Sequence, residues 1–310
     1  MDRRMFIERA IVAGAALPLV SGYAAGKPRR RDGYLEFDDD VPGLKPKVFA
    51  KDILYRDGSY PGYQAFSETG KELYYTVTDK NWQSSRIRRV CVDAPNKIET
   101  LLLLNDKWEG EPCITPDGLR LFFTAIQPPG DRAWHSDLYV CDRASTGWGA
   151  PKRLPAPVNS PKSEWHASVT DEGILYFASE RDGDRLRADL FRAQPTNGRY
   201  PTVEKLPAGI NTEFNDCDPL IAPDERYLIF HSNRPGGYGE HDLYIAYRDG
   251  KGRWSNPRNM GPDINSPGWE MAPSLTPDGK YLLFTRRKAF QTDEPSQIFW
   301  VSTSIIATLQ

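Results

Sequence analysis

Acidic residues recur along the chain at nearly constant intervals, each at the start of an apolar segment. They are Glu109, Glu164, Asp216 and Glu270, and consecutive members are 52 to 55 residues apart. Carboxylates that come close together raise one another's pKa and attract cations. Such a group could act as general acid and base, bind a hard cation or hold a basic peptide. A residue that recurs in every repeat can also serve only to shape its loop, and the spacing does not separate these two interpretations.

Residues that break the repeat are better candidates for a ligand site. His166 stands two positions after Glu164, where the other repeats carry Glu111, Asp218 and Ala272. The two-residue period of a strand predicts that His166 and Glu164 face the same side. A histidine beside carboxylates can transfer protons near neutral pH. If the protein is an enzyme, the predicted catalytic residues are Glu109, Glu164, His166, Asp216 and Glu270.

Aromatic and basic side chains accumulate in the segments around these residues. Flat aromatic faces stack on sugars or hold peptides, and arginine side chains bind carboxylates. The predicted ligand-binding residues are Trp134, His135, Trp165, Arg181, Arg234, Tyr238, His241 and Trp269. Packing between neighbouring loops is the alternative for the aromatic residues. For the arginines the alternative is ion pairing across a loop, of Arg181 with Asp189 and of Arg234 with Asp242.

A repeated fold has to position these residues. A tight turn recurs at residues 115–118, 170–173, 222–225 and 276–279, with a degenerate copy at residues 68–70. Each turn precedes a segment rich in aromatic and β-branched residues, which favour strands. A strand pattern of the Asp-Leu-Tyr type begins 17 to 20 residues after the turn, and an outer strand and an asparagine follow. Four short strands in a unit of about 53 residues are typical of a propeller blade.

The repeats resemble the WD-like propeller repeats of TolB-type periplasmic proteins, in which Pro-Asp-Gly lies between two strands and an Asp-Leu-Tyr strand follows. Both signatures occur here, for example at residues 116–118 and 137–139, and the resemblance extends over residues 44–303. The units also resemble propellers of bacterial envelope proteins of the OmpA class, where an Asn-Ser or Asn-Thr segment precedes an acid. The corresponding asparagines are Asn159, Asn211 and Asn265. The resemblance implies a propeller fold but not one activity, because such propellers bind, scaffold or catalyse.

The predicted fold is all-β, a single propeller of five blades with four antiparallel strands each, over residues 44–310. The last unit has no outer strand after Ser302, whereas residues 44–49 resemble one. We therefore expect the N-terminal strand to close the ring, which removes the exposed sheet edges that invite aggregation. A six-bladed ring, as in TolB itself, is the alternative, although it requires a sixth unit that the sequence does not contain.

The N-terminus has the plan of a signal peptide over residues 1–25. Arg3 and Arg4 precede an apolar run at residues 10–20, and small residues follow it. That run is shorter than the ~20 apolar residues of a membrane-spanning helix. The paired arginines resemble the bacterial twin-arginine signal, with ordinary Sec export as the alternative. The predicted location is periplasmic or secreted, and residues 26–43 are predicted to form a solvated linker.

Charge and motifs exclude several classes of protein. The 40 basic residues against 42 acidic ones give a formal net charge of −2, which provides no field for holding a nucleic acid. The sequence lacks a phosphate-binding loop, a Gly-x-Ser-x-Gly elbow and a His-Glu-x-x-His helix. The cysteines have no metal-ligand spacing and are expected to be mostly free thiols; they are Cys91, Cys113, Cys141 and Cys217. No cofactor is predicted, although a divalent cation in the central channel stays open.

Two functions fit these patterns. The first is an exported binding or scaffolding propeller that contacts an envelope protein, peptide or glycan at its top face around the central channel, and such a propeller is expected to be a monomer. The second is a carbohydrate-active enzyme, a glycoside hydrolase or polysaccharide lyase, that uses channel carboxylates. A glycoside hydrolase needs two carboxylates roughly 5 to 9.5 Å apart across a sugar-sized cleft.

Overall fold

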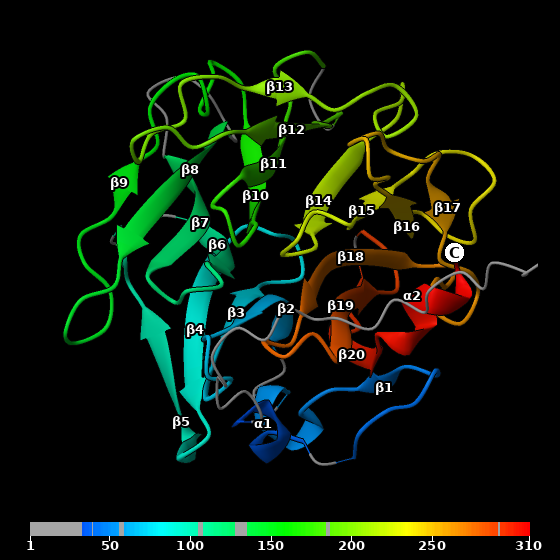
Figure 1. Cartoon of the computed structure of the whole chain (residues 1–310). Coiled ribbons are helices and arrows are strands. Elements are labelled where there is room, and N and C mark those ends of the chain that lie inside the picture. Colours follow the sequence, from blue (N-terminus) through cyan, green and yellow to red (C-terminus); the bar gives the residue numbers. More distant parts are fainter. Residues whose placement is uncertain are drawn as a thin grey trace, which may run out of the picture.

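Five small antiparallel sheets surround a common axis in the computed structural model (Figure 1). The structure describes residues 33–38, 40–55, 59–104, 108–127, 135–183, 187–290 and 292–310. In this part of the chain each sheet has four strands, which confirms the predicted five-bladed β-propeller. The predicted signal peptide, residues 26–32 of the predicted linker and Trp134 lie outside the described residues.

Each blade takes its strands in sequence order from the axis outwards. The first blade contains β2 (Tyr60–Phe66), β3 (Glu72–Thr78), β4 (Ser85–Cys91) and β5 (Ala94–Leu101). The second contains β6 (Trp108–Ile114), β7 (Arg120–Gln127), β8 (His135–Asp142) and β9 (Lys152–Arg153). The third contains β10 (Glu164–Val169), β11 (Leu175–Ser179), β12 (Asp189–Ala193) and β13 (Glu204–Lys205). The fourth contains β14 (Asp216–Ile221), β15 (Tyr227–Ser232), β16 (Asp242–Tyr247) and β17 (Arg258–Asn259).

The fifth blade combines both ends of the chain. It contains β18 (Trp269–Leu275), β19 (Tyr281–Arg287) and β20 (Gln297–Ser302), and β1 (Lys47–Val48) pairs with β20 as its outermost strand. Three short helices complete the described elements: η1 (Gly33–Glu36), α1 (Lys51–Leu54) and α2 (Ser304–Thr308). None of the helices in the described residues is long and apolar enough to cross a membrane.

The recurring Thr-Pro-Asp-Gly sequence makes the turn between the first two strands of a blade. In the second blade the Thr115 hydroxyl accepts a 3.0 Å hydrogen bond from the N–H of Arg120, and Asp117 accepts one of 2.9 Å from the N–H of Leu119. Gly118 has a φ of 74°, a conformation that costs glycine little. The turn therefore satisfies its own backbone and fixes the register of the hairpin.

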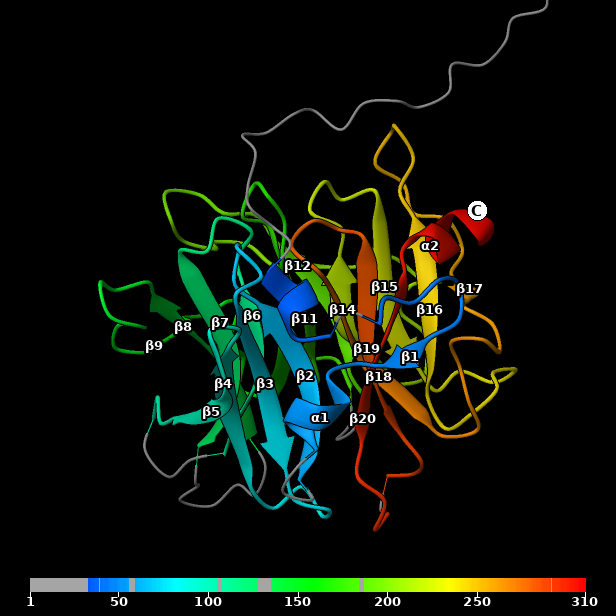
Figure 2. The same cartoon turned by 90° about the horizontal axis from the view of Figure 1, so that it is seen from below.

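The two faces of the ring differ in what they carry. We call the face with these hairpin turns the turn face, and the opposite face, with the loops between second and third strands and the connections between blades, the loop face. In the side view the loop face lies at the bottom, and α2 lies at the top with the turn face (Figure 2). The candidate ligand residues of the sequence belong to the loop face.

The N-terminal segment packs into the seam between the fifth and first blades. Phe49 lies 5.1 Å from Trp300, centroid to centroid, in an edge-on contact. Tyr34 and Phe37 are buried in the same cluster, and the Tyr34 hydroxyl donates a 2.7 Å hydrogen bond to Asp278. Side chains within the predicted linker thus belong to the packed core, and the folded domain begins before residue 44.

Candidate functional site

Five residues at equivalent positions of the innermost strands form what we call the axial ring. They are Tyr63, Glu111, His166, Asp218 and Ala272, and all have positive φ values between 39° and 57°. At each of them the pairing with the second strand shifts register. An extra residue of this kind is a β-bulge, which turns a side chain out of the ordinary alternation. Non-glycine residues in this conformation are strained, and such strain concentrates at functional sites.

The side chains of the axial ring meet at the axis. The rings of Tyr63 and His166 lie 5.7 Å apart although the first and third blades are not neighbours. The N–H of His166 donates to Oε2 of Glu111 at 2.7 Å, and the N–H of Ala272 donates to Oδ2 of Asp218 at 3.0 Å. Each carboxylate therefore also holds the bulge of the next blade.

Three of the four histidines of the chain gather around Asp218. Nδ1 of His231 lies 3.3 Å from Oδ2 of Asp218, in a contact without hydrogen-bond geometry. The rings of His231 and His241 are perpendicular at 4.9 Å, and His166 belongs to the axial ring itself. Buried nitrogens without a hydrogen-bond partner occur in all three: Nδ1 of His166, Nδ1 and Nε2 of His231, and Nδ1 of His241. Such atoms are uncommon in folded proteins and mark places where a polar group can bind.

The two carboxyl groups of the axial ring have opposite pKa shifts. Burial, and then the negative charge of Asp218, raise the pKa of Glu111 to about 8. Burial also opposes ionisation of Asp218, but His231 and the Ala272 amide outweigh it and hold the pKa of Asp218 below its usual range. Burial lowers the pKa of His166, and burial together with His231 lowers the pKa of His241 to about 3. Near pH 7 the site therefore combines a carboxylic acid, a carboxylate and two neutral imidazoles.

Aromatic residues surround the axis on the loop face. We call Trp82, Trp108, Trp165, Trp269 and Phe290 the aromatic collar. Trp269 stacks on Phe290 at 5.6 Å and on His241 at 4.5 Å, and Trp82 lies 6.3 Å from Trp269. The outermost ring, Phe290, is 47% exposed. A continuous path of rings thus leads from solvent to the histidines beside Asp218.

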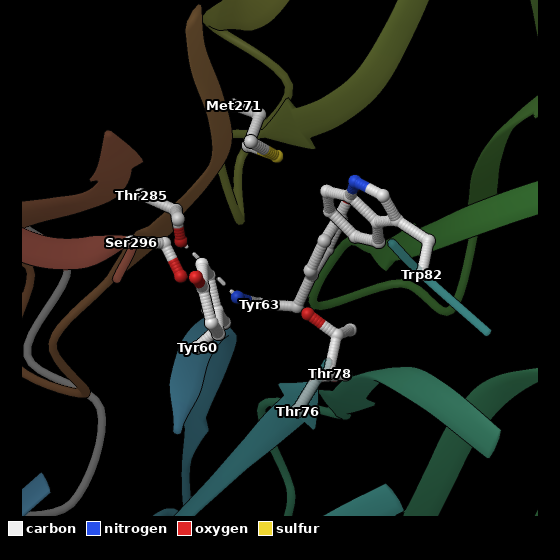
Figure 3. A pocket seen from close by; sticks show the side chains of 9 residues that line it. Tyr60, Tyr63, Thr76, Thr78, Trp82, Met271, Thr285 and Ser296 are labelled. Atoms are coloured by element: carbon white, nitrogen blue, oxygen red, sulfur yellow. Dashed lines mark hydrogen bonds between the residues drawn. The ribbon is translucent and has the colours of Figure 1, made fainter. Parts of the chain in front are cut away.

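The space beneath the collar is small. A cavity of about 10 Å³ lies between Tyr63, Trp82 and Met271 (Figure 3). That volume suffices for at most one water molecule. Of the axial ring only Tyr63 borders this cavity, and the ring of Trp82 forms part of its lining. Trp82 is the collar residue of the β3–β4 loop, where its indole N–H makes a 3.4 Å hydrogen bond to the carbonyl of Phe290.

The four repeated acids are used within their own blades. Glu164 accepts hydrogen bonds from the N–H and hydroxyl of Ser160 at 2.9 and 2.6 Å, and Nη2 of Arg181 lies 3.3 Å away. Asp216 and Glu270 have the same kind of partners, Thr212 with Arg234 and Ser266 with Arg286. Glu109 accepts from the N–H groups of Leu103 and Leu104. All four carboxylates are buried.

The bulge separates residues that the sequence placed together. Glu164 lies opposite Ser179 and Ala167 lies opposite Phe177, so His166 is the extra residue between them. The predicted alternation, with Glu164 and His166 on one side, is therefore wrong at this position. The side chain of Glu164 serves the loop, whereas that of His166 lies at the axis.

The arginines predicted to bind ligand have internal partners. Arg181 lies over the ring of Phe191 at 4.7 Å and pairs with Glu164, and Arg234 pairs with Asp216. The pairing expected from sequence, with Asp189 and Asp242, is wrong. Asp189 instead pairs with Lys205 at 2.7 Å, and Asp242 accepts from the side-chain amide of Asn259 at 2.7 Å.

The remaining predicted ligand residues are spread over the loop face. Trp269 and His241 belong to the path of rings beside Asp218, and Trp165 belongs to the collar, 6.2 Å from Trp108. Tyr238 is 51% exposed and lines a separate groove of about 440 Å³ that no axial-ring residue borders. Nε2 of His135 lies 3.6 Å from the buried Asp137.

Three important residues were missed in the sequence analysis. His231 occupies the second-strand position at which other blades have Thr76, Thr124 and Thr285, and this break in the repeat was a usable signal. Trp82 and Phe290 lie in loops of variable length, where the repeat gives no register. Among the described residues no group of three His, Cys, Asp or Glu side chains is arranged to hold a metal ion, and all four cysteines are free.

Comparisons with known proteins support the fold alone. No family model and no curated protein matches the chain. The putative TolB of Agrobacterium tumefaciens has a TM-score of 0.50 and 18% identity, covering 74% of this chain and 71% of that one. An α-L-arabinofuranosidase from Lactobacillus brevis has a TM-score of 0.52 and 10% identity, covering 81% and 93%. TolB from Acinetobacter baumannii has a TM-score of 0.49 and 18% identity; the match covers 78% of this chain but only 54% of that one.

Proposed function

We propose that this protein is an exported envelope propeller that binds a protein or peptide segment on its loop face. The observation that carries the proposal is the path of rings from Phe290 through Trp269 to the histidines around Asp218. This path breaks the symmetry of the repeat, as a site for one ligand must. The TolB-type repeats and the signal-like N-terminus favour an envelope location.

Around the axis the shape of the loop face favours a contact surface over a deep pocket. The cavity under Trp82 has a volume of about 10 Å³, whereas a small-molecule site usually measures about 300–1,000 Å³. The groove of about 440 Å³ beside Tyr238 is not bordered by any axial-ring residue. Exposed aromatic rings contribute much of the binding energy at protein interfaces because they bury a large area at a small entropic cost. Phe290 and Tyr238 provide such rings on the same face.

A carbohydrate-active enzyme is the second candidate, and one observation favours it. Glu111 has a raised pKa and Asp218 a lowered one, which is the division between acid and base that glycosidases use. These two residues, rather than the repeated acids, would then be the catalytic pair. The small volume of the cavity weighs against this candidate, because a sugar would have to displace part of the collar.

A thermal-shift experiment tests the binding proposal. Residues 26–310 are screened against envelope-derived peptides and against glycans, since a ligand raises the melting temperature by mass action. The exposed Phe290 is replaced in Phe290→Ala, with Leu119→Ala on the turn face, where Leu119 is 59% exposed, as the matched control. A peptide that stabilises the wild type and the Leu119 variant but not Phe290→Ala supports the proposal. Equal responses of both variants would contradict it.

A turnover experiment distinguishes a carbohydrate-active enzyme from a binding protein. Any glycan that stabilises the protein is incubated with it and analysed for shortened products, with Glu111→Gln and Asp218→Asn in parallel. Cleavage by the wild type that both variants lose would replace the binding proposal with the enzymatic one. Stabilisation by peptide without turnover of any glycan would leave the binding propeller.

A further inference from the structure

We infer that the site at the axis takes a positively charged nitrogen group, an arginine guanidinium or a lysine ammonium, presented by the segment that the loop face binds. This inference rests on the proposed function and names the chemistry its ligand must carry. Three observations support it: open hydrogen-bond acceptors, carboxyl groups that have no lysine or arginine partner among the described residues, and an aromatic wall beside them.

The first observation is the excess of acceptors. His166 and His231 are 93% and 98% buried, as their exposed fractions of 7% and 2% show, and among the described residues neither Nδ1 atom has a hydrogen-bond partner. Burial lowers the pKa of His166 and so keeps its imidazole neutral near pH 7, and a neutral imidazole offers one nitrogen as an acceptor. The carboxylate of Asp218 lies among these rings. A ligand that supplies several N–H donors from one point would satisfy acceptors that the protein leaves open, and guanidinium and ammonium groups are such ligands.

The second observation is the charge of the site. Within the described residues neither Glu111 nor Asp218 has a lysine or arginine within ion-pair distance, although the repeated acids Glu164 and Asp216 do. Buried carboxylates are normally paired. A cation entering the axis would give Asp218 a second partner besides His231 and would offset the negative charge that raises the pKa of Glu111.

The third observation is the apolar and aromatic wall beside the carboxyl groups, where the N–H of Ala272 donates to Asp218. Tyr63, Met271 and Ala272 form a small apolar cluster with Trp82 and Trp269 packed against it. Such a wall accommodates the methylene stem of a lysine or arginine while its head reaches polar atoms. Aromatic faces also attract the charged head directly.

The protein itself shows that these rings accept a guanidinium. Arg287 is buried, and its guanidinium carbon lies 4.7 Å from the ring centroid of Trp82 and 5.0 Å from that of Tyr60. Arg287 donates to the carbonyls of Lys80 and Ala289, so it is committed to the seam between the fifth and first blades. Tyr63 and Trp269 also have their rings beside Trp82, and among the described residues no lysine or arginine lies over either of them.

Removal of the Trp82 ring would enlarge the space beside Tyr63. The cavity that both residues line is too small for a guanidinium, and Trp82 lies in a short loop with a φ of 61°. Trp82→Ala should therefore admit the ligand more easily than the wild type. The variant provides a test that does not depend on how readily the wild-type ring moves.

Calorimetric titration with N-acetyl-arginine methylamide tests the inference, with the neutral isostere N-acetyl-citrulline methylamide as the matched ligand. We expect the arginine compound to bind at least about tenfold more tightly than citrulline, both to the wild type and to Trp82→Ala, because a charged hydrogen-bonded group contributes that much or more. N-acetyl-lysine methylamide should bind as a cation as well. Equal affinity for arginine and citrulline, or no binding of arginine to either protein, would overturn the inference.

A pair of variants locates the binding. Asp218→Asn should abolish the preference for arginine over citrulline, whereas Asp171→Asn, which removes one exposed acid from the turn face, should leave it unchanged. The comparison of the two ligands on the wild type does not depend on whether Asp218→Asn folds. If a peptide requires Phe290 but shows no preference for arginine, the inference fails and the binding proposal stands. If no peptide requires Phe290, the binding proposal fails first.

Discussion

The backbone N–H of His166 donates a 2.7 Å hydrogen bond to Oε2 of Glu111 and so joins the innermost strands of the third and second blades. The hydroxyl of Thr124 donates to the same oxygen at 2.6 Å. Glu111 is therefore both a member of the candidate site and a structural link between two blades, and its protonation state should affect the stability of the whole ring.

The free energy of unfolding should fall as the pH rises from about 4.5 to about 8, because in this range Glu111 is protonated in the folded protein but not in the unfolded chain. Its pKa rises from 4.5 to about 8 on folding. Below pH 4.5 both states carry the proton and the group has no effect; above it the unfolded chain loses the proton first, and the free energy of unfolding declines until about pH 8. Urea unfolding at several pH values measures this slope. Glu111→Gln should reduce it, and an unchanged slope in that variant would contradict the assignment.

The carboxylate of Glu164 should matter for stability and not for binding. Its side chain is fully buried against Ser160 and Arg181, so Glu164→Gln should lower the free energy of unfolding by about 1–3 kcal/mol. Urea unfolding near pH 7 checks the value, and a double-mutant cycle with Arg181→Met isolates the pair. Ligand affinity of the folded variant should be unchanged. A variant of normal stability that no longer binds would instead make Glu164 a site residue, as its sequence position suggested.

The buried asparagine that recurs in three blade connections, as Asn159, Asn211 and Asn265, should be important for stability. Asn211 accepts from the N–H of Leu190 at 2.7 Å and donates to the carbonyls of Leu190 and Leu206, both at 2.9 Å. Asn211→Ala leaves these backbone groups buried without a partner and should cost about 2–3 kcal/mol. Thermal and urea unfolding measure the loss. Asn256→Ala, at an exposed position, is the control and should change stability little.

The hairpin turn at residues 222–225 allows the effect of backbone conformation on stability to be measured separately from side-chain contacts. Glu225 has a φ of 58° at the turn position that carries glycine in the other blades, and its carboxylate meets Tyr176 and Arg248, each at 2.5 Å. Glu225→Ala and Glu225→Gly both remove these contacts. Because only glycine is at ease at this φ, the glycine variant should be more stable than the alanine variant by about 1 kcal/mol. Equal stability would show that the turn relaxes.

Local signals explain why the fold was predictable. The hydroxyl of Thr115 and the carboxylate of Asp117 bond to backbone N–H groups within five residues, so the sequence of the turn determines its structure wherever it occurs. The same holds for Glu164, Asp216 and Glu270 at the start of three inner strands, whose partner Ser or Thr is four residues earlier. Patterns of this kind repeat in register and identify a blade without knowledge of its neighbours.

The candidate site depends on contacts that no local pattern contains. His166 reaches the axis because a bulge inserts it between two paired residues. The two-residue period of a strand instead predicts that His166 and Glu164 face the same side. The contact between Asp218 and His231 joins two strands of one blade. The site around it also includes His166 and Tyr63, whose rings meet from two other blades. The residues that depart from the repeat pattern were therefore the hardest to identify from the sequence as members of a site.

The pairing of β1 with β20 also sets the order in which the molecule can assemble. Lys47 lies opposite Trp300, more than 250 positions later in the chain, so the first strand leaves the ribosome long before its partner has been synthesised. The first four blades use contiguous segments and can form while translation continues. The fifth blade has to wait for the final strand, and closing so long a loop is slow. Until then a nascent chain carries two unpaired sheet edges, and this is the interval in which it is most exposed to aggregation.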